Sequence, residues 1–320
     1  MHVWNGLSEV PADIGRCVVA LGNFDGVHVG HQAVLRTLVE QAARRAATSV
    51  VVTFEPHPIA VLRPDLTPPM LTSLRRRLTL IEATGVDAVV VVEFTTGFAA
   101  QTPQQFVRSV FVERLHAALV VVGHDTRFGV RNTGSVETLE QLGSRYGFEV
   151  IALEDIGTGT RWSSSQVRAL LADGEVAAAA ELLGRPHRVD GTVVHGDHRG
   201  RLLGFPTANL GQQVEGMVPA DGVYAGWLTR VDLPEGAPDR VLPTAISIGT
   251  NPTFDGAERR VEGYVLDRTD LELYGEHIAY EFVARLRPTV KFDGMEPLIE
   301  KMNEDVLRCR AALQTIVPTS

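Results

Sequence analysis

Lysine is nearly absent from this 320-residue chain. Only Lys291 and Lys301 occur, so 28 of the 30 basic residues are arginine. A Walker A phosphate loop needs a lysine after its last glycine, and Schiff-base catalysis needs a lysine in the site. The sequence therefore excludes a Walker A loop, and it excludes a Schiff-base lysine in the first 290 residues. Any site for nucleotide phosphates must use arginine, histidine, backbone amides and metal.

Cysteine, net positive charge and long apolar runs are also scarce. Cys17 and Cys309 are nearly a chain length apart, so they form neither a disulfide framework nor a metal knuckle and fit a reducing compartment. The net charge of −9 provides no positive field for nucleic acid or anionic lipid. No apolar run approaches the roughly 18 residues of a membrane helix, and residues 1–15 lack the pattern of a signal peptide. We therefore expect a cytoplasmic protein that binds neither nucleic acid nor membrane.

The first half of the chain alternates apolar runs with amphipathic stretches. The runs are continuous rather than alternating, which is typical of strands covered on both faces. Predicted strands lie at 17–22, 49–54, 87–94, 118–123 and 148–153, and predicted helices at 31–47, 73–85, 102–115 and 135–147. This order predicts a doubly wound parallel sheet of the α/β class. We interpret the arginines at 75–77 as a solvated helix face rather than a polyanion site.

The pattern changes after two short predicted helices at 163–174 and 175–184. Short β-like runs between 187 and 287, joined by Gly- and Pro-rich turns, are typical of a small antiparallel barrel, and a last helix is predicted at about 295–315. We therefore predict two domains, residues 1–184 and residues 185–320.

The segment GNFDGVHVGH (22–31) follows the first predicted strand and begins the first helix. Ligands of open parallel sheets bind beyond the carboxyl ends of the strands, and a helix N-terminus attracts phosphate. His28 and His31, three residues apart, share a face of the first turn and can donate hydrogen bonds to phosphate. A metal site with Asp25 as third ligand is a weaker alternative, since such closely spaced ligands rarely complete a zinc sphere. An ordinary strand-to-helix turn is the structural alternative.

Three further polar segments are expected at the same edge of the sheet. TFEPHP (53–58), VGHDTRFG (122–129) and RWSSSQVR (161–168) each follow a predicted strand. Singly, each could be an ordinary turn or a helix N-cap. Together with residues 22–31 they favour a ligand site.

The second half contains the stretch GFPTANL (204–210). In an extended strand Thr207 and Asn209 point to one face, and their oxygens suit hydrated Mg²⁺ shared with nucleotide phosphates. An edge strand interrupted by proline is the alternative. Glu262 lies in a later predicted strand, where it is either an ordinary outward-facing residue or a base that takes a proton from a hydroxyl.

Together these motifs resemble the prokaryotic bifunctional riboflavin kinase/FAD synthetase family, over the whole chain. The first half is similar to its nucleotidyltransferase domain of the HxGH type, and the second half to its riboflavin kinase barrel. The resemblance implies ATP-dependent phosphorylation of riboflavin to FMN, then adenylylation of FMN to FAD with release of pyrophosphate. It implies riboflavin, FMN and ATP as the small-molecule partners and Mg²⁺ as the cofactor.

The resemblance also implies roles for individual residues. In the first reaction centre the catalytic residues would be His28, His31 and Arg168. Residues expected to contact ATP there are Gly22, Asn23, Phe24, Asp25, Arg161, Ser164 and Ser165, and the flavin end would be held by Asp125 and Phe128. In the kinase half, Thr207 and Asn209 would bind Mg-ATP and Glu262 would be the general base. The loop over that nucleotide would contain Gly196, Asp197, Gly200 and Arg201.

Three alternative functions stay open at this point. An HxGH adenylyltransferase acting on another phosphate acceptor would leave GFPTANL unexplained. A non-catalytic flavin-binding protein would be expected to lose the catalytic side chains, which are all present. A riboflavin kinase with weak or absent FAD synthetase activity is suggested by Thr126, which stands where the family usually has an aromatic residue.

Overall fold

The chain forms two compact units in a computed structural model that describes residues 1–154, 162–196, 204–253 and 256–314. One unit comprises 1–68 with 73–163, and the other comprises 69–72 with 164–320. The predicted domain boundary, between 184 and 185, falls after two helices that group with the second unit, and it stays a prediction.

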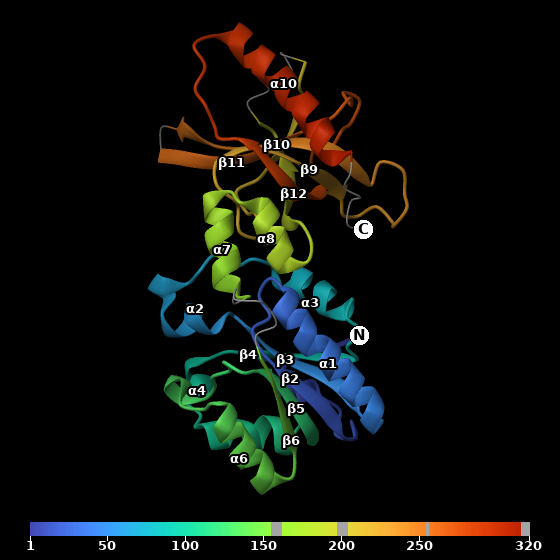
Figure 1. The fold of residues 1–320 in the computed structure, drawn as a ribbon, viewed down its shortest axis with the longest axis vertical. Helices are drawn as coiled ribbons and strands as arrows, with labels where there is room; N and C mark the ends of the chain where they lie inside the picture. The colour runs from blue at the N-terminus through green and yellow to red at the C-terminus, as the bar shows by residue number, and fades with distance from the viewer. Residues whose placement is uncertain (155–161, 197–203, 254–255, 315–320) are drawn as a thin grey trace. The chain divides into compact units, whose positions relative to one another are not determined.

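The first unit is built on a parallel six-stranded sheet with the order β1-β4-β3-β2-β5-β6. Figure 1 labels β2 to β6 of this sheet. Its strands are β1 (His2–Asn5), β2 (Cys17–Leu21), β3 (Thr48–Glu55), β4 (Ala88–Glu93), β5 (Ala117–Gly123) and β6 (Glu149–Leu153). Its α-helices are α1 (Val29–Arg45), α2 (Pro58–Leu62), α3 (Leu74–Glu82), α4 (Thr96–Ala99), α5 (Pro103–Phe106) and α6 (Val136–Tyr146). Short helical turns are η1 (Leu7–Glu9), η2 (Pro64–Leu66), η3 (Val107–Val112, π-helical) and η4 (Val130–Asn132).

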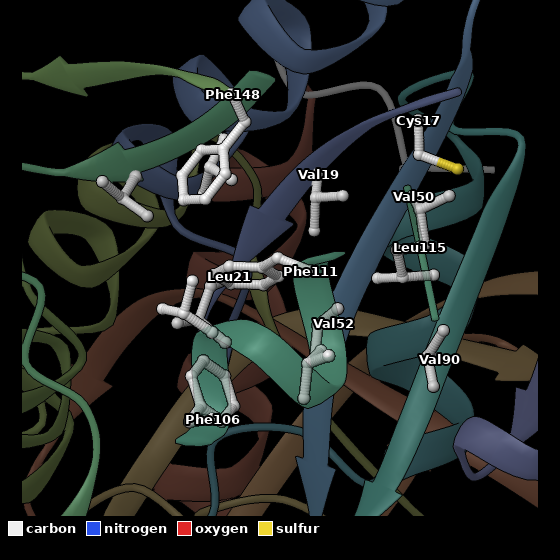
Figure 2. Packing of buried hydrophobic residues seen from close by; sticks show 14 of the residues in the cluster. Cys17, Val19, Leu21, Val50, Val52, Val90, Phe106, Phe111, Leu115 and Phe148 are labelled. Carbon is white, nitrogen blue, oxygen red and sulfur yellow. The ribbon is translucent and has the colours of Figure 1, made fainter. Parts of the chain in front are cut away.

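Both faces of this sheet are buried, which explains the continuous apolar strands. Val19 and Leu21 pack into a cluster that α5, η3 and α6 cover, while Val18 and Ala20 pack into a second cluster under α1 and α3. Figure 2 shows the first cluster, in which phenylalanine rings from the covering helices lie against strand valines. The predicted doubly wound fold is confirmed.

The chain reverses its direction of travel across the sheet at β2. From β2 it proceeds through β3 to β4 on one side, and β5 and β6 then add to the other side. Connections diverge at such a switch point, which leaves a crevice outside the carboxyl ends of the strands. The turn that contains both histidines leaves β2 at this edge.

Three features of the first unit differ from the predictions. β1 adds an edge strand beside β4. It was not predicted, because a strand of four mostly exposed residues shows no hydrophobic pattern. The helix predicted at 102–115 has only α5 in regular form and continues as the π-helical η3, whose Val107, Val110 and Phe111 all reach the core. The interpretation of 75–77 as a solvated face is wrong for Arg77, which is fully buried because its guanidinium bonds to backbone carbonyls.

The second unit contains a closed barrel with the strand order β10-β11-β8-β7-β12-β9. The strands are β7 (His187–Val194), β8 (Thr207–Leu210), β9 (Gly222–Arg230), β10 (Val241–Thr253), β11 (Gly256–Val265) and β12 (His277–Arg287). The helices are α7 (Ser164–Asp173), α8 (Val176–Leu183) and α10 (Met295–Leu313). The predicted antiparallel barrel and C-terminal helix are confirmed.

The last helix is held on the barrel by an apolar seam. Cys309 and Leu313 of α10 pack against Ala225 of β9 and Val283 and Leu286 of β12. At the neighbouring position, Gly226, an added Cβ would lie 2.0 Å from the Glu281 carbonyl oxygen, so only glycine lets these two strands approach. Across the ranges that the structure describes, no helix is both long and apolar enough to cross a membrane.

Both thiols should be unreactive in the folded protein. Burial raises the pKa of the Cys17 thiol to about 12 and that of Cys309 to about 11, and the thiolate is the reactive species. We expect Ellman's reagent at pH 8 to label neither cysteine in the native protein and both in guanidinium chloride. Fast labelling of either thiol in the native protein would contradict this burial.

Candidate active sites

The turn after β2 is conformationally strained. Phe24 and Val27 have left-handed backbones, with φ of 51° and 39°. Such conformations cost about 1–3 kcal/mol each in non-glycine residues and persist only where the surroundings enforce them. Both side chains are 1% exposed, so the core holds the turn in place. The sequence between β2 and α1 therefore forms a rigid frame for the histidines.

His28 and His31 lie against each other at the start of α1. His28 is the N-cap, and its Nδ1 accepts a hydrogen bond from the His31 amide at 3.3 Å. The proton of a neutral His28 ring is therefore on Nε2. The two rings stack with centroids 3.6 Å apart, and two positive charges at that distance repel strongly. The pair therefore presents two imidazole rings side by side at the first turn of the helix.

The end of β3 lies beside the histidine turn, which is the segment 22–31 from the end of β2 into the first turn of α1. The side-chain amide nitrogen of Asn23 is 3.3 Å from Nε2 of His57, and Thr53 Oγ1 donates to the Asn23 carbonyl at 3.2 Å. The structure thus brings together the segments 22–31 and 53–58, as the sequence predicts. Gly22 lies in the same turn, as does Asp25, which is 2% exposed.

The two residues predicted to hold the flavin follow β5 but differ in exposure. Asp125 is exposed, whereas Phe128 is buried and its ring lies 5.7 Å from that of Phe106. The amide of Thr126 between them donates to the Gly123 carbonyl at 3.0 Å, which forms a tight turn. Asp125 is therefore the accessible member of this pair.

A group of aromatic side chains that was not predicted from the sequence lies near Phe128. The ring of Phe106 contacts both this group and Phe128. The half-buried rings of Phe54, Phe94 and Phe98 have centroids 5.4 to 5.9 Å apart, and Phe98 lies 5.9 Å from Phe106. The available signal was an aromatic residue at the carboxyl end of two predicted strands, 49–54 and 87–94.

The serine motif lies in the second unit. Ser164, Ser165 and Arg168 occupy the first two turns of α7, and Arg168 Nε donates to the Pro69 carbonyl at 2.8 Å. Arg161 is outside the described residues. The predicted helix start is confirmed, and the roles of these side chains stay predictions.

In the barrel, the predicted kinase residues form one hydrogen-bonded group. β8 lies between β11 and β7, and Asn209 is directly opposite Glu262. Asn209 Nδ2 donates to Thr207 Oγ1 at 3.2 Å, and Thr207 Oγ1 donates to Glu262 Oε2 at 3.2 Å. Glu262 is therefore tied to the other two side chains.

These side chains suit a hydrated, oxygen-seeking cation that is shared with phosphate. A hydroxyl, an amide and one carboxylate are hard oxygen ligands. Among the residues described, no cluster of three His, Cys, Asp or Glu could enclose a metal by itself.

A cavity of about 530 Å³ opens beside this polar group. Thr207, Asn209 and Glu262 form one part of its wall, and Phe205, Tyr264, Phe292, Leu298, Met302 and Val306 add apolar surface. A cavity of this size with a few convergent polar groups suits a small molecule. The contribution of α10 was not predicted from the sequence, although Leu298, Met302 and Val306 recur every four residues and so share one face of the helix.

A buried ion pair anchors the wall of the cavity. Arg287 at the end of β12 donates to Asp305 of α10 from Nε at 2.9 Å and from Nη2 at 2.7 Å, with the two side chains 12% and 5% exposed. This two-point contact fixes α10 against the barrel.

Gly196 lies close to the side chain of Asn209. A Cβ there would lie 2.6 Å from Asn209 Nδ2. The other predicted loop residues, Asp197, Gly200 and Arg201, fall outside the described ranges.

Comparison with known sequence families defines both units. Residues 10–167 match the family described as FAD synthetase, and residues 183–313 match the family described as riboflavin kinase. The chain is therefore a two-domain transferase with a nucleotidyltransferase and a kinase, enzymes that use ATP and generally a divalent metal.

Individual relatives agree over nearly the full length. The bifunctional riboflavin kinase/FMN adenylyltransferase of Escherichia coli (strain K12) is 38% identical over 309 residues, covering 96% of this chain and 95% of that protein. The protein of the same name from Bacillus subtilis (strain 168) is 34% identical over 314 residues, covering 95% of each. The chain belongs to the bifunctional riboflavin kinase/FMN adenylyltransferase family, which confirms the predicted resemblance.

One solved structure is similar over almost the whole chain. It is titled as a macrolide-efflux protein from Streptococcus pneumoniae, with a TM-score of 0.85 and 30% identity, covering 96% of this chain and 98% of that one.

Adding a methyl group at Gly196 should weaken ATP binding by the kinase. The new Cβ would push the Asn209 amide away from Thr207. We expect Gly196→Ala to raise the KM for ATP in FMN formation about tenfold, the equivalent of one hydrogen bond. Gly249→Ala is the matched control, because a Cβ at that strand position meets only Thr289 at 4.0 Å. Equal KM values in the two variants would contradict the prediction.

Proposed function

We propose that the barrel phosphorylates riboflavin with Glu262 as the general base. The observation that carries this proposal is the hydrogen-bonded group of Thr207, Asn209 and Glu262 on the wall of the 530 Å³ cavity. Glu262 accepts the proton of the ribityl 5′-hydroxyl as that oxygen attacks the γ-phosphorus of ATP. The bond from the γ-phosphorus to the bridging oxygen breaks, and the products are FMN and ADP.

We further propose that Thr207 and Asn209 hold the nucleotide together with Mg²⁺. A bound Mg²⁺ would neutralise phosphate charge. The chain's own contribution is to orient the Thr207 hydroxyl and the Asn209 amide, which adjacent strands fix in register with the carboxylate.

For the first unit we propose adenylylation of FMN. A phosphate oxygen of FMN attacks the α-phosphorus of ATP, and pyrophosphate leaves as FAD forms. His28 and His31 donate hydrogen bonds to the phosphate charge that develops, and the N-terminus of α1 adds a favourable dipole. No covalent intermediate is needed, so catalysis consists of positioning and charge stabilisation.

The aromatic side chains near β3 and β4 favour the proposal that this unit binds a flavin. The half-buried rings of Phe54, Phe94 and Phe98 offer apolar surface to a planar ring system. The exposed Asp125 can accept hydrogen bonds from the ring's polar edge.

Removing the base should abolish one reaction only. Glu262→Gln keeps the size of the side chain but cannot take a proton, so we expect FMN formation from riboflavin to fall by about 100-fold or more. FAD formation from added FMN should persist at the wild-type rate. A chromatographic time course of both products measures this, and parallel loss of both activities would contradict separate sites.

The double substitution His28→Ala with His31→Ala should have the opposite effect. FMN should form normally and accumulate, while FAD formation falls because the phosphate loses its donors. The same time course provides the measurement. Full FAD synthesis by the double variant would remove the role proposed for the histidines, and absence of FAD from the wild-type reaction would favour a kinase with an inactive synthetase.

A further inference from the structure

Arg77 of α3 is a buried charge that the proposed chemistry leaves unused. It is 0% exposed, whereas Arg75 on the same helix is exposed. Its carboxylate partner, Glu55, lies 2.7 Å away, but that side chain is 44% exposed. Burying a guanidinium carries a large desolvation penalty, which a partly exposed partner offsets poorly. The position of Arg77 therefore requires another reason.

Two backbone carbonyls receive hydrogen bonds from this guanidinium. Arg77 Nη1 donates to the Asn23 carbonyl at 3.1 Å, and Nη2 donates to the Phe54 carbonyl at 3.2 Å as well as to Glu55. Asn23 belongs to the histidine turn, and Phe54 belongs to the segment that leads to His57. One side chain from α3 thus connects the two motifs that meet at the edge of the sheet.

The Asn23 carbonyl directly precedes the strained part of the turn. It also accepts from Thr53 Oγ1 at 3.2 Å, so two donors fix the orientation of the peptide that enters Phe24. Phe24 has φ of 51°, and its ring lies edge-on to that of His31 at 5.1 Å. His31 in turn stacks on His28 at 3.6 Å. A shift of this peptide would therefore move the paired imidazoles.

We propose that Arg77 is a positioning residue for FMN adenylylation. Its guanidinium holds the Asn23 carbonyl against the end of β3, which keeps Phe24 in its left-handed conformation and the stacked histidines in their working orientation. The planar guanidinium spans two carbonyls at once, which a lysine ammonium does not reproduce. The inference rests on the function proposed for His28 and His31.

The test compares Arg77→Met and Arg77→Lys with the exposed control Arg75→Met in the full chain. We expect Arg77→Met to lower kcat for FAD formation from FMN about 10- to 100-fold, since small displacements of reacting groups have effects of that order. The KM values for FMN and ATP should change less than about twofold, because the side chains expected to contact the two substrates are unchanged in this variant. Arg77→Lys should recover part of kcat, and Arg75→Met should match the wild type.

Two further measurements separate positioning from folding. FMN formation by the same protein samples reports on the other unit and should stay unchanged. Thr53→Val removes the second donor to the Asn23 carbonyl while Arg77 remains, and it should lower kcat in the same direction. Imidazole NMR signals of His28 and His31 should move in Arg77→Lys and Thr53→Val but not in Arg75→Met.

The inference would be overturned if Arg77→Met, Arg77→Lys and Thr53→Val all had the histidine NMR signals and the kcat of the control Arg75→Met. It would also be overturned if FAD formation fell only in proportion to the loss of folded protein, measured by near-UV circular dichroism, while Thr53→Val had no effect. Failure of the proposed function looks different, because His28→Ala with His31→Ala would then retain full FAD synthesis.

Discussion

A parallel strand that is buried on both faces has room for polar chemistry only at its ends. All five residues of β2 are buried, and the first polar side chain after it is Asn23. The same constraint acts on β3 and β5, so His57 and Asp125 also follow strand ends. These polar groups are thereby gathered along one edge of the sheet. The strand order reverses at β2, and open parallel sheets bind their ligands at such a switch point.

The barrel meets the same chemical demand through strand alternation. Thr207 and Asn209 are two residues apart and so share a face, and antiparallel pairing with β11 puts Glu262 opposite Asn209. Under the proposed function, the two units therefore handle phosphate by different means. One would use imidazoles at a helix N-terminus, and the other would use oxygen ligands that suit a shared cation.

In this chain, which has only two lysines, arginine provides the positive charges that tie structural elements together. Arg287 joins α10 to the barrel through Asp305, Arg188 pairs with Asp190, and Arg77 connects the turn after β2 with the end of β3. In each case the planar fork donates to two acceptors at once. The arginine bias therefore matters for the framework of both units.

The sequence by itself determined the class of both units, the order of most strands and helices along the chain, and the positions of the polar motifs. Hydrophobic pattern and turn chemistry are local, and a parallel sheet gathers its strand ends at a common edge whatever the details. Tertiary structure alone decided which arginine is buried, that η3 is π-helical, and that α10 lines the cavity. These depend on acceptors and partners distant in the chain. The Asn23 carbonyl lies 54 residues from Arg77, and such a separation leaves no periodic signal.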